Sequence, residues 1–238
     1  MANEILHRDG NEWLLHDGAW GPSLPRALFE PGELERRGWL RGTSAGRRQA
    51  WFLEYAEQNM VLRHYWRGGL MAKLSHDRYL WNGVERSRPF REWRLLTALR
   101  ALRLPVPRPV AARLQRRGLH WRGDLLTVRI PDATPLDELV RSQRDDSALW
   151  RRVGATIAHF HTTGAWHADL NVRNILVDAP GTVWLIDWDR GRLGVHRQRS
   201  HSANLARLHR SLRKWPQLAH GAREGWPELL MGYHRKDG

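Results

Sequence analysis

The stretch that most constrains the fold is HADLNVRN at residues 167–174, because of the elements predicted on either side of it. Before it, residues 145–164 have the apolar spacing of an amphipathic helix, with capping residues at 145–147 and Gly164 at its end. After it, two short apolar runs, ILVD and VWLID, flank an Ala-Pro-Gly turn at 179–181 and predict a β-hairpin. A helix, a polar loop and a hairpin in this order would bring the end of the second run back beside the loop.

Four side chains of this segment suit phosphoryl transfer, in which a hydroxyl attacks a nucleotide phosphate. We expect Asp169 to accept the proton of that hydroxyl, and Asn174 and Asp187 to hold Mg²⁺ against the phosphates. His167 is expected to support the loop through hydrogen bonds instead of reacting. A lone His-Ala-Asp is common, and Asp and Asn are ordinary turn residues. The prediction therefore depends on the whole order of helix, loop, hairpin and acid.

Length and composition indicate a globular protein of a reducing compartment. With 238 residues, a hydrophobic fraction of 41% and 14 tryptophans, the chain can form two lobes that share a cleft. It contains no cysteine, and its first residues, MANEILHRDG, lack the features of a secretory signal. No run approaches the roughly 18 apolar residues that a membrane span needs. We therefore expect a protein of the cytosol or of a cytosolic membrane face.

The chain is strongly basic, with 39 Lys and Arg against 25 Asp and Glu and a formal net charge of +14. Such an excess indicates a polyanionic partner, such as nucleic acid, anionic lipid or a phosphorylated substrate. A solvated arginine-rich surface explains it equally well. Residues 63–103 favour peripheral membrane contact because they contain ten Lys or Arg among apolar side chains. Each of these apolar residues alone suits a protein core just as well; they are Leu70, Met71, Leu74, Tyr79, Leu80 and Trp81.

The first half of the chain is predicted to be rich in strands and the second half helical. Residues 1–40 contain three prolines and several glycines and are expected to be irregular. Apolar and aromatic runs on either side of Gln58-Asn59 predict a hairpin, and the spacing within residues 90–102 predicts a helix. We therefore expect an α+β, bilobal fold with a mostly antiparallel β N-lobe at residues 1–130 and a helical C-lobe at residues 131–238.

Three stretches, LRHYWRGGLMAKL, DRYLWNGVERSRPFREWRLL and HADLNVRNILVD, resemble the 3-deoxy-D-manno-octulosonic acid (Kdo) kinases, a lipopolysaccharide kinase group within the protein-kinase-like superfamily. The resemblance covers about residues 40 to 235. It implies a protein-kinase-like fold and transfer of the ATP γ-phosphate to a hydroxyl of Kdo, expected to be the 4-hydroxyl, on Kdo-lipid IVA. It also implies ATP and Mg²⁺ as cofactors. The expected place is the cytoplasmic face of the inner membrane of a Gram-negative bacterium, in peripheral contact with it.

The resemblance also indicates nucleotide-binding residues in the N-lobe. Where kinases usually have a lysine on the third strand, paired with a glutamate on the next helix, this chain has Arg63 and Glu92. Arginine can hold phosphate and pair with the glutamate, although its planar fork is wider than an ammonium group. Lys73 is the alternative anchor. The loop over the phosphates is expected at Gly42, Thr43, Ser44 and Gly46, because small residues let backbone N–H groups approach phosphates.

Several other functions remain open. Another small-molecule or heptose kinase of the same fold is the nearest. A protein kinase is less well supported, because residues 188–238 contain no Ala-Pro-Glu and leave little room for peptide-binding helices. Aminoglycoside-type kinases use acidic clefts, unlike this basic chain. A non-catalytic nucleic-acid-binding protein is possible by charge, but no such motif is visible and no nucleic acid partner is expected. The scattered histidines have no convincing metal-ligand spacing and are interpreted as surface or core residues; they are His159, His161, His196, His201 and His209.

Overall fold

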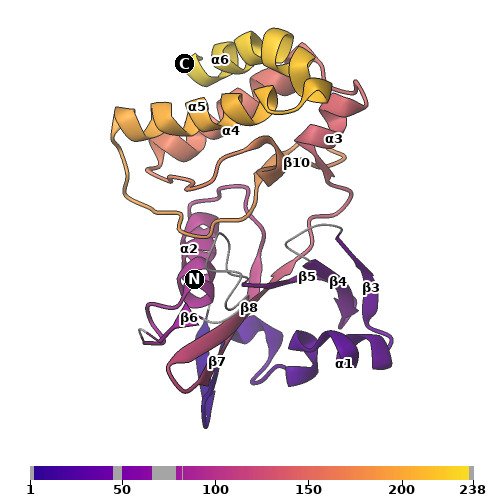
Figure 1. Cartoon of the computed structure of the whole chain (residues 1–238), viewed down its shortest axis with the longest axis vertical. Coiled ribbons are helices and arrows are strands. Elements are labelled where there is room, and N and C mark those ends of the chain that lie inside the picture. The colour runs from indigo at the N-terminus through magenta and orange to yellow at the C-terminus, as the bar shows by residue number, and fades with distance from the viewer. Residues whose placement is uncertain (1–2, 45–49, 66–78, 82, 236–238) are drawn as a thin grey trace. The chain divides into compact units, whose positions relative to one another are not determined.

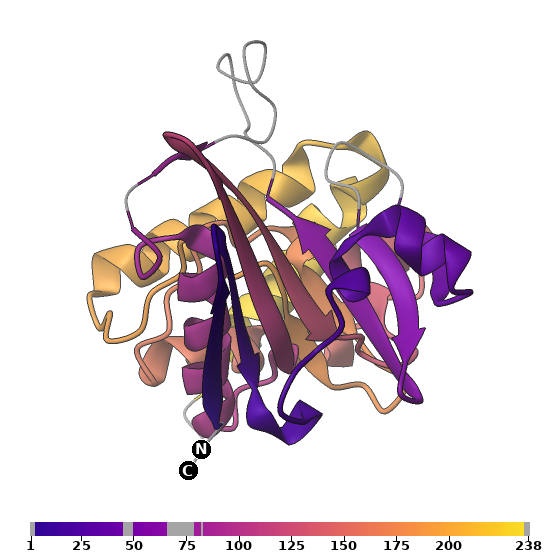
Figure 2. The ribbon, with the colours of Figure 1, turned by 90° about the horizontal axis from the view of Figure 1, so that it is seen from below.

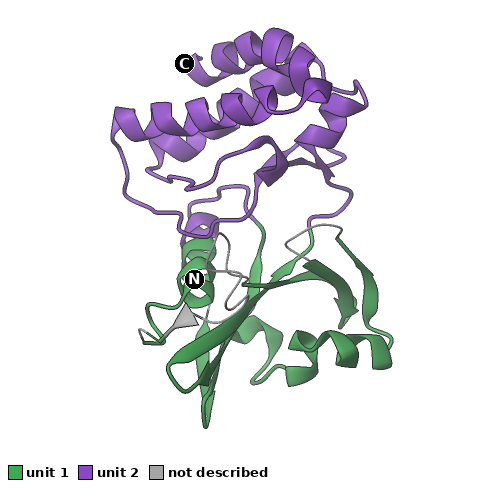
Figure 3. Ribbon diagram, in the orientation of Figure 1, with its two compact units in different colours: residues 1–97, 107–129 green, residues 98–106, 130–238 purple. Residues whose placement is uncertain are grey.

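The computed structural model describes residues 3–44, 50–65, 79–81 and 83–235. The chain forms two compact units, which Figure 3 colours separately. Unit 1 comprises residues 1–97 and 107–129, and unit 2 comprises residues 98–106 and 130–238. The α+β class is confirmed, because the N-terminal part is an antiparallel sheet and the C-terminal part is mainly helical.

Unit 1 is built on one antiparallel sheet, whose strands follow the order β1-β2-β7-β8-β5-β4-β3 while β6 also pairs with β8 (Figure 1). Its longest strands are β7 and β8, with 9 residues each. Two helices accompany the sheet, α1 (Pro31–Arg36) and α2 (Arg88–Ala101), which confirms the helix predicted at 90–102. The strands are β1 (Glu4–Asp9), β2 (Glu12–Asp17), β3 (Leu40–Thr43), β4 (Ala50–Tyr55), β5 (Gln58–His64), β6 (Tyr79–Leu80), β7 (Pro109–Arg117) and β8 (His120–Val128).

The expectation that residues 1–40 are irregular is wrong, because they include a hairpin at the edge of this sheet. β1 pairs with β2, and β2 pairs with β7. The chain turns at Gly10, whose φ of +55° costs glycine nothing. The preceding Asp9 completes an Asp-Gly pair, a common hairpin signal that the prolines further along outweighed in the prediction. Those prolines lie in the turns and in the short helix α1 that follow the hairpin.

The two faces of the sheet bury different segments (Figure 2). On one face, Leu62 belongs to an apolar cluster that includes Leu28 and Leu34 from the region of α1. On the other face lies α2, where Pro89 approaches Gly123 of β8 so closely that a Cβ there would come within 2.7 Å of the proline ring. Because successive side chains of a strand point to opposite faces, neighbouring residues on β5 contact different segments: Leu62 packs in the apolar cluster, and Arg63 contacts α2.

The hairpin predicted near Gln58-Asn59 is present as β4 and β5. Its turn lies just before the predicted position, at Ala56 and Glu57, which have φ values of +50° and +59°. Two central residues with positive φ are typical of a type I′ turn, whose twist matches that of the paired strands. The paired strands fix the register that puts Ala50 opposite Arg63.

Unit 2 combines helices with a small antiparallel sheet of order β11-β10-β9. The hairpin predicted on either side of residues 179–181 is confirmed by the antiparallel strands β10 and β11. In their register Ile175 lies opposite Leu185, and Val177 lies opposite Val183. The strands are β9 (Thr134–Pro135), β10 (Ile175–Val177) and β11 (Val183–Leu185). The helices are α3 (Leu136–Arg141), α4 (Ser147–Thr162), α5 (Gln198–Arg213) and α6 (Trp226–His234).

Helix α4 begins and ends as its sequence predicts. The Asp146 carboxylate accepts a hydrogen bond from the backbone N–H of Leu149 at 2.6 Å, and Gly164 follows the helix with a φ of +77°. Its apolar face is buried, and α6 packs against it in backbone contact. A Cβ on Gly154 of α4 would lie 1.9 Å from a carbonyl oxygen of α6, and one on Gly232 of α6 would lie 2.1 Å from a carbonyl oxygen of α4. Only glycine permits this approach.

Among the residues that the structure describes, no helix combines the length and the apolar character that crossing a bilayer requires.

Candidate active site

The polar stretch 167–174 forms a loop between α4 and β10, and His167 holds it from within. Nδ1 of His167 accepts a hydrogen bond from the backbone N–H of Asp169 at 3.1 Å. This fixes the neutral tautomer with its proton on Nε2, which donates to the carbonyl oxygen of Ile186 at 2.9 Å. One imidazole therefore joins the loop to the residue that directly precedes Asp187.

The surroundings of His167 keep the ring neutral. Burial lowers the pKa of His167 below its ordinary value, and the hydrogen bond to Ile186 and the charges of Asp187 and Asp169 only partly oppose this. The ring packs edge-on against Trp188 with centroids 4.7 Å apart, and Trp188 stacks on Phe160 of α4 at 5.2 Å. The supporting role predicted for His167 thus has a hydrogen-bonded and packed basis, and it stays a prediction.

Asp169 and Asn174 meet on the same loop. The backbone oxygen of Asp169 accepts hydrogen bonds at 2.9 Å from the side-chain amides of both Asn171 and Asn174. The amide nitrogen of Asn174 is thereby occupied, while its Oδ1 accepts no hydrogen bond from any described residue. The Asp169 carboxylate is half exposed, and its Oδ1 lies 2.9 Å from Nη1 of Arg207 on α5.

Asp187 follows β11 and reaches the same place through the backbone. The N–H of Ile186 donates to the carbonyl oxygen of Asn174 at 3.0 Å, which places Asp187 next to the loop. Its φ is +62°, a left-handed conformation that is uncommon outside glycine and asparagine or aspartate. Such a conformation turns the chain sharply at the end of a strand. The structure therefore brings Asp169, Asn174 and Asp187 together within unit 2.

A buried polar network behind the loop was not predicted. Asn204 of α5 donates from Nδ2 to the carbonyl oxygen of His167 at 2.7 Å, and its Oδ1 accepts from the His167 N–H at 3.4 Å. The same Oδ1 accepts from Nε2 of His161 at 3.3 Å, and Nδ1 of His161 accepts from the hydroxyl of Tyr233 at 2.8 Å. Every polar atom of this chain of side chains finds a partner, so the loop is tied to three helices.

The histidines of this network are core residues, as one interpretation of the sequence had it. Burial lowers the pKa of His161 to about 4, although the hydrogen bond that the ring donates to Asn204 acts to raise it, so the ring is neutral near pH 7. His161 also stacks on His201 at 4.2 Å. A signal for Asn204 existed in the sequence: it occupies the buried face of α5, in helical spacing with Leu208 and Leu212.

In unit 1, Arg63 and Glu92 form the pair that was expected. Nη2 of Arg63 on β5 lies 2.5 Å from Oε1 of Glu92 on α2. The Tyr65 hydroxyl donates to the other carboxylate oxygen, Oε2, also at 2.5 Å. The Glu92 side chain is 2% exposed and that of Arg63 is 30% exposed, so the cation extends toward the surface while its partner is buried. Whether this pair binds ATP phosphates stays a prediction, and the alternative anchor Lys73 lies outside the described residues.

The predicted phosphate loop is described only in part. Gly42 and Thr43 belong to β3, and Gly42 lies at a register shift with a φ of +150°, which favours glycine. Ser44 closes the gap to β4, because its N–H donates to the carbonyl oxygen of Ala50 at 2.9 Å and its Oγ accepts from the N–H of Ala50 at 2.8 Å. The backbone N–H of Ser44 is therefore already hydrogen bonded within the sheet. Gly46 lies outside the described residues.

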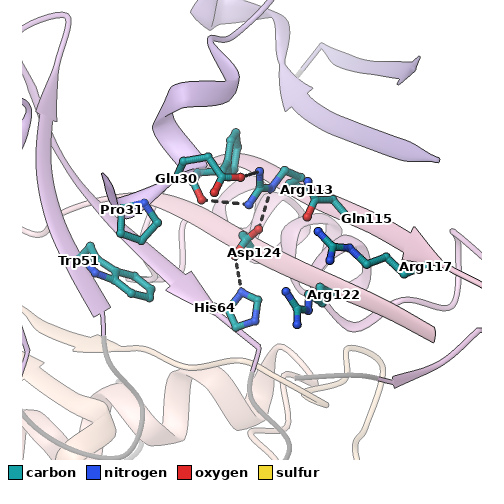
Figure 4. Close-up of a pocket in the computed structure, with 10 residues that line it drawn as sticks. Glu30, Pro31, Trp51, His64, Arg113, Gln115, Arg117, Arg122 and Asp124 are labelled. Atoms are coloured by element: carbon teal, nitrogen blue, oxygen red, sulfur yellow. Dashed lines mark hydrogen bonds and ion pairs between the residues drawn. The ribbon is translucent and has the colours of Figure 1, made fainter. Parts of the chain in front are cut away.

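A separate pocket of about 370 Å³ is lined by His64, Arg113 and Asp124 (Figure 4). Because His64 follows Arg63 on β5, the two side chains point to opposite faces of the sheet. His64, Asp124 and Arg113 form a row across β5, β8 and β7: Nδ1 of His64 lies 2.7 Å from Oδ1 of Asp124, and Nε of Arg113 donates to Oδ2 of Asp124 at 2.8 Å. Glu30 adds a second carboxylate to Arg113. The row attaches the segment before α1 to the sheet, and it is distinct from the Arg63 pair.

Of the six apolar residues named for peripheral membrane contact, Trp81 is the one whose side chain the structure describes. The Trp81 ring stacks on that of Trp13, with ring centroids 5.2 Å apart, and the Arg116 guanidinium lies over the Trp81 ring, 4.8 Å from its centroid. Trp81 therefore packs within unit 1. Nothing is described for the side chains of the other five apolar residues named with it in the sequence.

The donor set of unit 2 fits Mg²⁺. Asn174 Oδ1 and the Asp187 carboxylate are hard oxygen donors, and Mg²⁺ is usually held by one or two such protein ligands together with substrate phosphates and water. In the described parts of the chain, no group of three or more His, Cys, Asp or Glu side chains could hold a metal alone. A magnesium ion here would therefore need the phosphates of a nucleotide to complete its coordination.

Comparison with known proteins identifies the family of this chain. The model of the lipopolysaccharide kinase (Kdo/WaaP) family matches residues 34–233. A 3-deoxy-D-manno-octulosonic acid kinase of Stenotrophomonas maltophilia is 49% identical over 170 residues, 71% of this chain and 68% of that protein. A protein of the same name from Xanthomonas campestris pv. campestris is 48% identical over 175 residues, 71% of this chain and 68% of that protein. Another, from Xanthomonas axonopodis pv. citri, is 47% identical over 171 residues, 72% of this chain and 68% of that protein.

Among solved structures, a co-crystal structure of WbdD with a kinase inhibitor is similar over 82% of this chain and 44% of that chain, with 14% identity and a TM-score of 0.46. The family match extends over most of the sequence and includes the whole of the loop 167–174 and Asp187. The chain therefore belongs to the lipopolysaccharide kinase (Kdo/WaaP) family.

Proposed function

We propose that this protein transfers the γ-phosphate of ATP to the 4-hydroxyl of Kdo on Kdo-lipid IVA, as a step in the synthesis of the lipopolysaccharide core. Membership of this kinase family implies ATP as the phosphate donor. The observation that carries the proposal is the hydrogen-bonded grouping of Asp169, Asn174 and Asp187 in unit 2. The relatives are named as Kdo kinases, and their identity of about half over most of the chain supports the same acceptor here.

In the proposed reaction, Asp169 accepts the proton of the Kdo hydroxyl as its oxygen attacks the γ-phosphorus. The bond between that phosphorus and the bridging oxygen of ADP breaks, and ADP leaves with the electron pair. A half-exposed carboxylate on a loop held by three hydrogen bonds suits this role. Asn174 and Asp187 would hold Mg²⁺, which supplies charge neutralisation at the phosphates when it is bound.

We assign His167 and the network behind it to positioning. A neutral imidazole with both nitrogens hydrogen bonded fixes the distance between the loop and the start of Asp187 without adding a charge. A protonated ring would lose the hydrogen bond from the N–H of Asp169. Positional precision of this kind matters because a misplaced general base loses much of its effect.

Arg63 is proposed to contact the ATP phosphates, with Glu92 and Tyr65 holding it in place. A guanidinium with five donors can keep one side on Glu92 and present the other to phosphate oxygens. Gly42, Thr43, Ser44 and Gly46 are proposed to cover the phosphates. Unit 1 would then be the nucleotide-binding lobe and unit 2 the catalytic lobe.

The protein is further proposed to act in peripheral contact with the cytoplasmic face of the inner membrane. An acceptor with acyl chains remains in the bilayer, and a chain with a formal net charge of +14 is attracted to an anionic surface.

The test is incubation of the purified protein with labelled ATP, Mg²⁺ and Kdo-lipid IVA, followed by mass spectrometry to locate the phosphate. The expected product carries one additional phosphate on Kdo, at position 4. A heptosylated acceptor is offered in parallel. Transfer to heptose alone, or no transfer to either glycolipid, would contradict the proposal.

A further inference from the structure

The C-terminal segment from residue 190 to residue 223 contains nine Lys or Arg and no Asp or Glu. Helix α5 occupies the centre of this segment, at Gln198–Arg213. The whole chain has 25 Asp and Glu among 238 residues, so a segment of 34 residues whose arginines only solvate the surface would be expected to contain several acids. The one-sided charge of α5 therefore calls for a partner of opposite sign.

Helical spacing collects these cations on one face. The buried face of α5 consists of His201, Asn204, Leu208 and Leu212. The opposite side is exposed and follows the i, i+3 and i+4 pattern of a continuous helix surface. We call it the α5 basic face, and its cations are Arg199, Arg207, Arg210, Arg213 and, directly after the helix, Lys214.

Within the described part of the chain, only Arg207 of this face lies within salt-bridge distance of a carboxylate, that of Asp169. Other cations of unit 2 are paired locally: Arg141 with Asp137, and Arg151 with Glu228. Like charges three or four residues apart on a helix destabilise it by a few tenths of a kcal/mol, roughly 0.2–0.5 per pair. The α5 basic face thus carries a small cost that an anionic ligand would reverse.

The α5 basic face meets the loop that carries the candidate base at two places. Near the middle of the helix, Arg207 contacts Asp169. At the C-terminal end, Trp215 is 38% exposed, and its ring is covered by Lys214 at 5.6 Å and by Arg173 of the loop at 5.2 Å. A ligand that reacts at Asp169 would therefore extend over Arg210, Arg213 and Lys214.

We propose that the α5 basic face is the docking surface for the phosphate and carboxylate groups of the anionic glycolipid acceptor; this rests on the proposed function and names the part of the chain that recognises the acceptor. Guanidinium groups bind phosphate and carboxylate in bidentate fashion, and a half-exposed tryptophan beside cations suits the boundary between headgroups and acyl chains.

The test is the double variant Arg210→Gln/Arg213→Gln, which leaves Arg207 and its contact with Asp169 in place. Glutamine is a good helix former, so α5 is retained. Sedimentation with phosphatidylcholine vesicles that contain Kdo-lipid IVA measures docking without turnover. We expect the apparent Kd to rise about tenfold or more, together with the acceptor KM, while the ATP KM stays within about twofold of wild type.

The matched control is Arg144→Gln/Arg152→Gln, which removes the same charge from two exposed arginines of unit 2 outside α5. It is expected to bind the acceptor vesicles like wild type. Vesicles of phosphatidylcholine and phosphatidylglycerol at equal charge form the second arm, and a short DNA duplex the third.

Loss of affinity confined to the acceptor vesicles supports the proposal. Unchanged vesicle binding by the Arg210 and Arg213 variant, an equal loss for both variants, or an equal loss on phosphatidylglycerol or DNA would each overturn it. A wild-type protein that binds acceptor vesicles through this face but transfers no phosphate would refute the proposed function and leave the docking surface standing.

Discussion

The two units hold their candidate functional side chains by opposite means. In unit 1, Arg63 is fixed by a charged partner, the buried carboxylate of Glu92. In unit 2, the backbone of the loop of Asp169 is fixed from within by neutral groups: His167, Asn204 and, behind them, His161. The charged contact of this loop is at the surface, where the exposed Arg207 lies 2.9 Å from the Asp169 carboxylate. A cation that must bind phosphate can share its charge with a buried acid, since phosphate supplies a second anion. A general base gains nothing from a buried cation behind it, so neutral hydrogen bonds position it without competing for its charge.

The difference has a consequence for pH. An arginine–carboxylate pair keeps its charges across the physiological range, whereas a network that depends on neutral histidines is lost when those rings are protonated. Substitutions in the two units should therefore differ in their effects on activity, on stability and on the pH dependence of stability.

The largest effect is expected for Asp187→Ala, which removes the proposed carboxylate ligand from unit 2. We expect kcat to fall by about three orders of magnitude, because charge neutralisation at the phosphates contributes several kcal/mol to the transition state. The measurement is the rate of labelled phosphate transfer as the Mg²⁺ concentration is varied. Asp178→Ala is the control, because Asp178 lies on the same hairpin but binds the N–H of Thr182 and the indole of Trp184. A similar loss in both variants would mean that the hairpin, and not the ligand, is responsible.

In unit 1, Glu92→Ala should reduce the free energy of unfolding by roughly 1–3 kcal/mol and raise the ATP KM. The substitution leaves Arg63 and the Tyr65 hydroxyl without their shared carboxylate, and the partial exposure of Arg63 limits the cost. Urea denaturation and ATP-dependent kinetics measure the two effects. Glu85→Ala breaks the exposed pair with Arg94 and should cost less than about 1 kcal/mol. Equal costs for the two glutamates would remove the special role of the Arg63 pair.

Asn204→Ala tests the neutral arrangement of unit 2. It leaves the backbone of His167 and Nε2 of His161 with unsatisfied buried groups, so the unfolding free energy should fall by roughly 1–3 kcal/mol. The loop also loses its buried side-chain contact with α5 and keeps those of Arg207 and Ser211, so kcat should fall while the ATP KM is kept. Ser202→Ala, on the exposed side of the same helix, is expected to change neither quantity. An Asn204→Ala protein with wild-type kcat would show that the loop does not need this tie.

The most gradual effect is in the pH dependence of stability, where the change over a single pH unit is small. His161 has a folded pKa of about 4 against an ordinary value of 6.5. Between these values the unfolded chain binds the extra proton, so stability is full above about pH 6.5 and declines as pH falls toward 4, by at most about 1.4 kcal/mol per pH unit. His161→Gln should flatten this decline, and Glu92→Ala should not. Thermal unfolding midpoints at pH 7, 6 and 5 provide the comparison, and parallel curves for wild type and His161→Gln would count against the neutral network.

Local elements could be predicted from the sequence because their signals are local. The hairpin β10–β11 has a Pro-Gly turn between apolar runs, and α4 has a capping acid and a terminal glycine. The segment before residue 40 was missed because proline and glycine content outweighed the Asp-Gly pair at its hairpin. The pairing of Arg63 with Glu92 was expected through the family resemblance, and no spacing rule alone would have given it.

The polar network could not be predicted for a physical reason. His161, Asn204 and Tyr233 lie on three helices, and nothing in a single sequence says which faces of separate helices meet. A buried asparagine on an apolar helix face is a usable signal, since such a side chain must find partners. The partners themselves depend on helix packing, which here is set by the close backbone contact at Gly154 and Gly232.

The central claim is that unit 1 binds the nucleotide and unit 2 performs the chemistry. It is tested most directly by measuring kcat and the ATP KM of Arg63→Ala and Asp169→Ala side by side in the labelled transfer assay. The account predicts a raised ATP KM for Arg63→Ala and, for Asp169→Ala, a loss of kcat of about 10²-fold or more with ATP binding intact. Turnover at the wild-type rate by folded Asp169→Ala, or an unchanged ATP KM and kcat for Arg63→Ala, would contradict it.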